Sequence, residues 1–407
     1  MIIEQAVLET RVGGVQCDEH VTQRGPFHLN GGVTPRQGTK SGGNAHGHGH
    51  DRNLTDQVGI RHRSDTPEQT GAMRVIAAFD KFKGTLSAHD AAHAVGHACW
   101  DLGIDCTEVA LADGGEGTLD ALGGANRTSA VTGPLGDVVE AAWRFHRGTA
   151  VIEMARASGL TLVGGPDAND AVAASTTGTG ELIDKALDLG AERIIVCLGG
   201  SATTDGGLGA VRAIHAPARL RSIEFIVACD VDTLFVDAAR VFAPQKGASP
   251  AQVRMLEGRL ERLVQMYKQN YGVDVSRVEG AGAAGGLAGG LVALGATLVP
   301  GFEMVAEETG LAEHLKGADL VITGEGQLDV TSFEGKVVGG VAELAHENGV
   351  PVAAIVGRVH PSAHDAEDYA LITRGVTDLV ATFGEDKAIS EPKSCVEQAA
   401  RALLPRG

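Results

Sequence analysis

The chain has 407 residues, of which 43% are apolar and only 4% aromatic, so it can bury one large core or, in the interpretation we prefer, two moderate ones. The formal charge of -18 and the pI near 5.2 argue against nucleic acid and anionic membranes as partners, because neither is attracted to an acidic surface. The six cysteines form no C-x-x-C pair and no zinc-binding spacing, which is typical of reduced core cysteines in a cytoplasmic protein. No apolar run reaches about 18 residues and the N-terminal residues lack the pattern of a secretory signal, so we expect a soluble protein.

Residues 1–72 differ in composition from the rest of the chain. Gly, His, Arg, Thr and Gln dominate, and the apolar periodicity disappears after the first dozen residues, which predicts a disordered extension that need not belong to the native protein. His46, His48 and His50 alternate with glycines, and a solvated low-complexity tail is a better interpretation of them than a loose metal site. We expect the folded protein to begin at Met73.

From Met73 onward, short runs of β-forming residues alternate with helical patterns. This alternation predicts an α/β protein built from βαβ units around a mostly parallel sheet. The predicted strands are 74–79, 107–111, 150–154, 193–198, 224–229, 319–323, 352–356 and 377–381.

Three stretches between these strands have helical or ambiguous patterns. Residues 180–189 predict a helix with Thr179 as N-cap and Gly190 at its end. Residues 254–269 predict a longer amphipathic helix whose Met and Leu stripe packs on the core. The glycine-rich stretch 280–291 is compatible with a close-packed helix or with the start of a ligand-binding loop, and the first is favoured.

The most informative loop follows the predicted strand 193–198. Its glycines let the backbone turn sharply and approach a ligand, and its hydroxyl and carboxylate groups can hold a phosphate or a magnesium ion. The residues that carry this prediction are Gly199, Gly200, Ser201, Thr203, Asp205, Gly206 and Gly207. A glycine-rich turn capped by Ser or Asp is the simpler alternative for a single loop of this kind.

Acidic residues beside glycines recur after other predicted strands. They are Asp113, Gly114, Gly115 and Glu116 in A-D-G-G-E-G-T, Asp230 after V-A-C, and Gly324, Glu325 and Asp329 in T-G-E-G-Q-L-D. Because open α/β sheets bind ligands at the carboxyl ends of their strands, this repetition favours a shared ligand site over isolated turns.

Lysines occur in turns where such a site needs positive charge: Lys81, Lys83, Lys246 and Lys336. Taken singly, each of them is more often a solvated surface lysine. Glycines, carboxylates and lysines together are what phosphoryl transfer requires. The chain has no P-loop motif, no protein-kinase motif set and no convincing G-x-G-x-x-G after its first strand, so this chemistry would use a different scaffold.

From Met73 to about Leu404, the chain resembles the bacterial glycerate kinase family, which is unrelated to P-loop kinases and protein kinases. The resemblance rests on nine motifs in order: A-F-D-K-F-K-G-T-L-S-A, L-A-D-G-G-E-G-T-L-D-A-L, V-I-E-M-A-R-A-S-G-L, T-G-T-G-E-L-I, G-G-S-A-T-T-D-G-G-L-G, V-A-C-D-V, F-A-P-Q-K-G-A, G-A-G-A-A-G-G-L and D-L-V-I-T-G-E-G-Q-L-D with the following G-K.

The resemblance implies ATP-dependent phosphorylation of D-glycerate with Mg²⁺, with 2-phosphoglycerate favoured over 3-phosphoglycerate. It also implies two α/β domains: a Rossmann- or flavodoxin-like three-layer domain from 73–130 plus 281–405, and a second α/β domain inserted at 131–280. The ligands would bind between them. The sequence leaves the oligomeric state open, and a homodimer is one candidate.

Matched onto this sequence, the resemblance assigns roles to the residues above. Asp205 is the first candidate for the general base and Asp230 the second, with Lys83 and Lys246 as catalytic cations. Asp205, Glu325 and Asp329 are the expected metal ligands. The expected substrate and phosphate ligands are Asp113, Gly114, Gly115, Glu116, Gly199, Gly200, Ser201, Thr203, Gly206, Gly207, Gly324 and Lys336.

The chain departs from the family pattern in a short segment after Gly209 and in the D-T-L-F that follows Val231, where the family carries N-P-L. These departures leave open a kinase for a related small sugar acid. A non-catalytic sensor of a phosphorylated ligand is an alternative from another class, and an NAD-linked dehydrogenase lacks its fingerprint loop.

Overall fold

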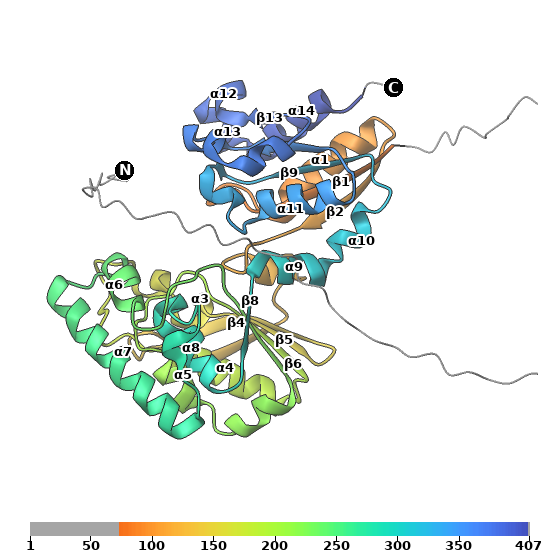
Figure 1. Cartoon of the computed structure of the whole chain (residues 1–407). Helices are drawn as coiled ribbons and strands as arrows, with labels where there is room; N and C mark the ends of the chain where they lie inside the picture. Colours follow the sequence, from red (N-terminus) through yellow and green to blue (C-terminus); the bar gives the residue numbers. More distant parts are fainter. Residues whose placement is uncertain (1–72, 406–407) are drawn as a thin grey trace, which may run out of the picture. The chain divides into compact units, whose positions relative to one another are not determined.

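The computed structural model describes residues 73–405. The predictions of a disordered, non-native extension and of a solvated histidine tail concern residues outside this range. All described residues belong to one compact unit, and most of their strands form two sheets (Figure 1). The prediction of an α/β protein is confirmed.

The first sheet is wholly parallel and has the order β13-β11-β9-β1-β2. Its strands are β1 (Arg74–Phe79), β2 (Asp105–Ala110), β9 (Leu320–Gly324), β11 (Val352–Val356) and β13 (Val376–Asp378). With the strands numbered within this sheet, the order is that of flavodoxin-like folds, in which the ligand binds where the strand order reverses. Here that point lies between β1 and β9.

Helices cover both faces of this sheet, because alternate residues of each buried strand point to opposite sides. Val75 and Ala77 of β1 pack in one apolar cluster with α1 (Ala88–Asp101) and α14 (Pro392–Leu403), while Ile76 and Ala78 pack in another with α11 (Val337–Glu347). The result is three layers, with α1 and α14 together on one face (Figure 1).

The second sheet has the order β3-β4-β5-β6-β7-β8. Its strands are β3 (Arg127–Thr132), β4 (Val138–His146), β5 (Thr149–Glu153), β6 (Arg193–Cys197), β7 (Glu224–Ala228) and β8 (Thr297–Val299). β4 pairs antiparallel with both β3 and β5, whereas β5, β6, β7 and β8 are parallel to one another. The helices α4 (Thr177–Asp188), α5 (Leu208–Ala213), α6 (Ala238–Phe242), α7 (Pro250–Tyr271) and α8 (Ala283–Ala293) contribute to its core.

The predicted segments compare well with these elements. Each of the eight predicted strands overlaps an observed strand, although most of 377–381 belongs to α12 (Leu379–Phe383). The hairpin β3–β4 was not predicted, because its strands mix exposed and buried positions and form no continuous buried apolar run. The helix α4 is confirmed, but the Thr179 cap is wrong, since the N-cap is Thr176 and Thr179 is buried inside the helix. Gly190 ends this helix with φ 78°, as predicted.

The two sheets use different segments of the chain: 74–110 plus 320–378 for the first, and 127–299 for the second. β8 at 297–299 therefore lies in the second sheet, beyond the boundary at residue 281. The division of these segments into domains stays a prediction.

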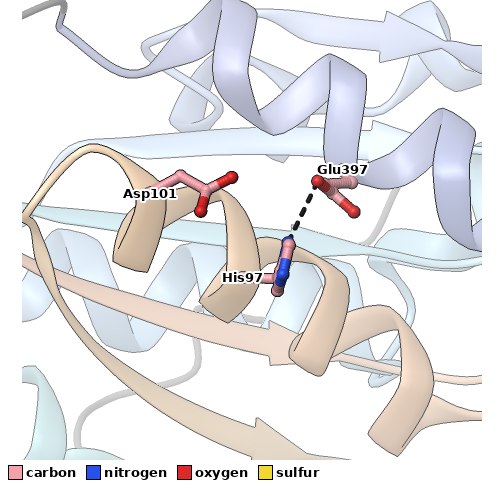
Figure 2. A group of neighbouring side chains, drawn as sticks. All are labelled: His97, Asp101 and Glu397. Carbon is pink, nitrogen blue, oxygen red and sulfur yellow. Dashed lines mark hydrogen bonds and ion pairs between the residues drawn. The ribbon is translucent and has the colours of Figure 1, made fainter.

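A cluster of three polar side chains, His97 and Asp101 of α1 and Glu397 of α14, lies between these two helices (Figure 2). His97 Nδ1 lies 3.1 Å from Glu397 Oε1, and potential metal-ligand atoms of His97, Asp101 and Glu397 lie within 4.8 Å of one another. Arg401, however, forms ion pairs with both carboxylates. We therefore interpret the group as an ion-pair network. Within residues 73–405, the helices are all too short or too polar to cross a membrane.

Candidate active site

Three carboxylates lie at the carboxyl edge of the first sheet. Glu325 follows β9, Asp80 follows β1, and Asp113 follows β2 after a short turn. These strands are adjacent and parallel, with Phe79 in register with Gly324 on one side and Ala110 on the other. Asp80 and Glu325 thus lie at the point where the strand order reverses, which is the usual ligand site of such a sheet.

Two of these carboxylates are unusually poorly solvated. Burial raises the pKa of Asp80 to about 6, opposed by Lys81 at 3.5 Å and reinforced by Asp113. Burial also raises the pKa of Glu325 to about 7, with a hydrogen bond from Ser332 opposing the shift and Asp80 reinforcing it. The Oε1 atom of Glu325 is buried and has no hydrogen-bond partner. A bound cation would satisfy both groups.

The carboxyl edge of the second sheet adds a fourth carboxylate. Asp230 follows β7, and its Oδ1 accepts a 2.6 Å hydrogen bond from the backbone N–H of Gly301, the first residue of α9 (Gly301–Thr309). Although Asp230 is exposed, partial desolvation by the concave surroundings raises its pKa, the Gly301 hydrogen bond opposes this shift, and Asp113 reinforces it. Asp113 is thus electrostatically coupled to Asp230 and Asp80, so the four carboxylates belong to one region.

The loop after β6 approaches this region with its backbone. A Cβ on Gly199 would lie 2.9 Å from the backbone N of Glu116 and 3.0 Å from Gly115 Cα. Only glycine allows the two glycine-rich loops to come this close.

The loops after β1, β2, β6 and β7 line a cavity of about 510 Å³, whose lining does not include Asp80 or Glu325. Nine predicted site residues line it: Lys83, Asp113, Gly114, Gly115, Gly199, Gly200, Ser201, Asp230 and Lys246. The structure therefore brings together loops from four strand ends of two sheets. The cavity also has apolar walls, to which Leu160, Leu198 and Phe242 contribute.

Lys246 is the buried cation of this cavity. Its side chain reaches the loop after β6, where Nζ donates 2.7 Å hydrogen bonds to Ser201 Oγ and to the carbonyl oxygen of Thr203. The residue is only 3% exposed. Burial lowers the pKa of Lys246 to about 7, and the charge of Asp205 opposes the shift.

Asp205 lies behind the loop and does not line the cavity. Its carboxylate accepts hydrogen bonds from the backbone N–H groups of Thr176, Gly207 and Gly209 at 3.0 to 3.1 Å, and from Thr176 Oγ1 at 2.9 Å. Both oxygens are occupied and the residue is 7% exposed. This geometry suits an anchor of the loop better than a general base or metal ligand.

Several other predicted residues also lie outside the cavity. Thr203, Gly206, Gly207 and Gly324 are buried in packing, and Glu116 lines a neighbouring cavity of about 400 Å³ with Asp80, Lys81 and Arg156. Asp329 caps a short 3₁₀ turn by accepting from the backbone N–H of Thr331 at 2.9 Å. Lys336 Nζ donates to Thr331 Oγ1 at 3.0 Å, and its charge acts on both Asp230 and Glu325.

The sequence prediction missed two acidic residues of this region. Asp80 stands directly after the first strand, in F-D-K. Its position after a predicted strand could have identified it in the same way as Asp113. Glu153 ends β5 and is 2% exposed; its carboxylate accepts from the backbone N–H groups of Gly117 and Leu119 at 2.8 and 2.9 Å and from Arg156. The sequence signal that could have identified Glu153 is its position as an acidic residue at the end of the apolar strand pattern V-I-E.

The fold and the position of these residues are typical of an α/β enzyme whose ligand site lies at the carboxyl edges of its sheets. Comparison with known proteins narrows this class: residues 75–218 and 213–405 match the glycerate kinase family.

A glycerate kinase from Halalkalibacterium halodurans is 38% identical over 369 residues, covering 81% of this chain and 97% of that protein. A glycerate 2-kinase from Escherichia coli is 40% identical over 353 residues, covering 75% and 92%. A crystal structure of a Salmonella typhimurium LT2 protein, proposed to be glycerate kinase 2, superposes with a TM-score of 0.71 at 35% identity, covering 82% of this chain and 97% of that one. The chain belongs to the glycerate kinase family, and it is an enzyme, a kinase.

Proposed function

We propose that the protein transfers the γ-phosphoryl group of ATP to a hydroxyl of D-glycerate and forms 2-phosphoglycerate. The observation that carries the proposal is the gathering of four carboxylates, two glycine-rich loops and a buried lysine around one region at the carboxyl edges of the sheets. The E. coli relative named as a glycerate 2-kinase supports the choice of product.

The donor set fits Mg²⁺, which prefers oxygen ligands. Glu325 and Asp80 would hold the ion, because both carboxylates are desolvated and Glu325 Oε1 has no partner. When bound, Mg²⁺ neutralises charge on the transferring phosphate. Asp329 faces its own turn and Asp205 is fully hydrogen-bonded, so neither is retained in this proposal.

Asp230 is the general base of the proposal. It lines the cavity, one of its oxygens is oriented by Gly301, and its raised pKa brings it closer to neutral pH, where proton transfer is efficient. It accepts the hydroxyl proton of the acceptor as the new O–P bond forms and the bond to the departing ADP breaks. Lys83 and Lys336 balance phosphate charge, and the backbone around Gly199 and Gly200 provides hydrogen-bond donors.

The test is a reaction of the protein with ATP, Mg²⁺ and D-glycerate, followed by phosphorus NMR of the product. A 2-phosphoglycerate signal supports the proposal; 3-phosphoglycerate overturns the product assignment, and no turnover overturns the function. Related sugar acids serve as competing acceptors. The homodimer and the cytoplasmic location stay predictions.

The variant Asp230→Asn should lower kcat by roughly 100-fold or more, because an amide cannot take the proton. Its amide oxygen can still accept from Gly301, so thermal stability should be retained. Asp237→Asn, which removes an exposed carboxylate paired with Arg240, is the matched control. Near-normal turnover by Asp230→Asn would remove Asp230 from the mechanism.

A further inference from the structure

Lys246 and Ser201 form a fixed pair on one wall of the cavity. The 2.7 Å hydrogen bond from Lys246 Nζ to Ser201 Oγ joins the segment after α6 to the loop after β6. Asn169 holds both segments, because its Nδ2 donates to the carbonyl oxygens of Ala202 at 3.0 Å and Lys246 at 2.8 Å. The pair is therefore held in place by neighbouring segments.

The direction of this hydrogen bond determines what the pair can bind. An ammonium group is a donor only, so Ser201 Oγ must be the acceptor and its own hydrogen is free to point elsewhere. Both residues line the cavity. Two Nζ hydrogens of Lys246 are used by Ser201 and Thr203, and the third remains. The pair thus offers an N–H and an O–H donor to one small acceptor group.

The charge of Lys246 is available to a ligand in the cavity. Asp205 is the charged group that acts on Lys246, and its carboxylate is occupied by four other donors. The two hydrogen-bond acceptors of Nζ, Ser201 Oγ and the Thr203 carbonyl, are neutral, and so is the Phe242 ring, whose centroid is 6.0 Å from Nζ. A buried cation with so little compensation favours a ligand anion.

The carboxylates Asp80, Asp230 and Glu325 are influenced by lysines other than Lys246. Lys81 acts on Asp80, while Lys336 acts on Asp230 and Glu325. A nucleotide triphosphate carries several charges and needs the metal and these lysines, whereas a single carboxylate needs one cation and one or two donors.

We propose that Lys246 Nζ and Ser201 Oγ bind the carboxylate of the acceptor, and so select a hydroxy acid over a neutral polyol. This inference rests on the proposed function, which it deepens by assigning the acceptor's acid group to one wall of the cavity. The acceptor hydroxyl is then left to face Asp230, which lines the same cavity.

The test compares full-length Lys246→Met and Ser201→Ala with the wild-type protein. Lys246→Met should raise KM for D-glycerate by roughly 10- to 100-fold and Ser201→Ala by roughly 10-fold, with KM for ATP changed less than about twofold. Lys268→Met, which removes an exposed lysine paired with Asp274, is the matched control and should change neither constant. If Lys246→Met fails to fold, Ser201→Ala alone decides the outcome.

A rise in KM for ATP with an unchanged KM for D-glycerate would assign the pair to phosphate and overturn the inference. Calorimetric titration of D-glycerate without ATP separates this failure from that of the proposed function. Wild-type binding that Ser201→Ala weakens by roughly 10-fold supports the pair even if no phosphoryl transfer occurs. Equal affinity in both proteins overturns it.

Discussion

Desolvated charges distinguish the cavity region from the rest of the surface. Asp80 and Glu325 are both buried and Asp80 raises the pKa of Glu325, while Lys246 is buried and forms hydrogen bonds to neutral groups. Such arrangements cost stability in the free protein and favour ligands that supply the missing charge. At the residue scale, we therefore expect Asp80 and Glu325 to favour a cation and Lys246 to favour an anion.

The pH dependence of Mg²⁺ stabilisation follows from the raised pKa values. Asp80 and Glu325 have folded-state pKa values of about 6 and about 7, above the unfolded values of 3.8 and 4.5. Their contribution to the free energy of unfolding is therefore fully present below about pH 4 and is lost as the pH rises through about 7. Because Mg²⁺ binds the ionised forms, a fixed Mg²⁺ concentration should raise Tm more at about pH 8 than at about pH 6. Thermal melts measure this, and equal shifts at both pH values, or an undiminished shift in Asp80→Asn/Glu325→Gln, would contradict it.

The role of Asp205 as an anchor predicts a loss of stability. In Asp205→Asn, an amide NH₂ faces backbone donors and the negative charge is lost, so the free energy of unfolding should fall by about 2–4 kcal/mol. Urea unfolding measures this. Asp170→Asn is the control, because Asp170 also accepts from two backbone N–H groups but is exposed. Unchanged stability with lost turnover would instead support the catalytic role expected from the sequence.

At the element scale, α8 supports the loop after β6. Three residues at its start, 284–286, have left-handed backbone angles, so the glycine-rich stretch combines a tight turn with a helix. Gly285 accepts a 3.0 Å hydrogen bond from Gly206 N–H through its carbonyl, and Tyr267 of α7 donates to the Gly206 carbonyl at 2.8 Å. The loop that bears Ser201 is thus shaped by α7 and α8 as well as by its own sequence.

Gly285→Ala tests this support. A Cβ at Gly285 would lie 2.0 Å from the carbonyl oxygen of Thr203, which itself accepts from Lys246. The control Gly190→Ala has a similar φ of +78° but open space around the new Cβ, so it should lose only about 1 kcal/mol of stability. In Gly285→Ala, the free energy of unfolding should fall by about 1–3 kcal/mol more than in Gly190→Ala, and turnover should be reduced. Urea unfolding and the kinase assay measure both effects, and equal losses in the two variants would contradict the prediction.

At the scale of the whole molecule, the site depends on both sheets. The first supplies Asp80, Asp113 and Glu325, and the second supplies Asp230 and the loop after β6. The first strand of the described fold begins at Arg74, and the family match begins at residue 75. Every residue assigned to the site follows these positions.

A chain that begins at Met73 should therefore have the same Tm as the full chain. Its kcat and its KM values for ATP and D-glycerate should differ from those of the full chain by less than about twofold. Thermal melts and the ATP-dependent assay on the two proteins measure this. A loss of activity in the shortened chain would show that residues before Met73 contribute to folding or to the site.

By itself, the sequence determined the features that depend on neighbours along the chain: the apolar runs of the parallel strands, the helix α4, and the glycine–acid loops at the strand ends. Of the residues that it indicated, Asp113, Asp230 and Lys246 line the cavity, and their roles stay predictions. Tertiary structure decided which loops meet. The pairing of β1 with β9 places Asp80 beside Glu325, although they lie far apart in the chain. Thr176 donates two hydrogen bonds to Asp205, which does not line the cavity. A carboxylate after a strand can bind a ligand or the protein's own backbone, and only the donors around it in the fold decide between the two.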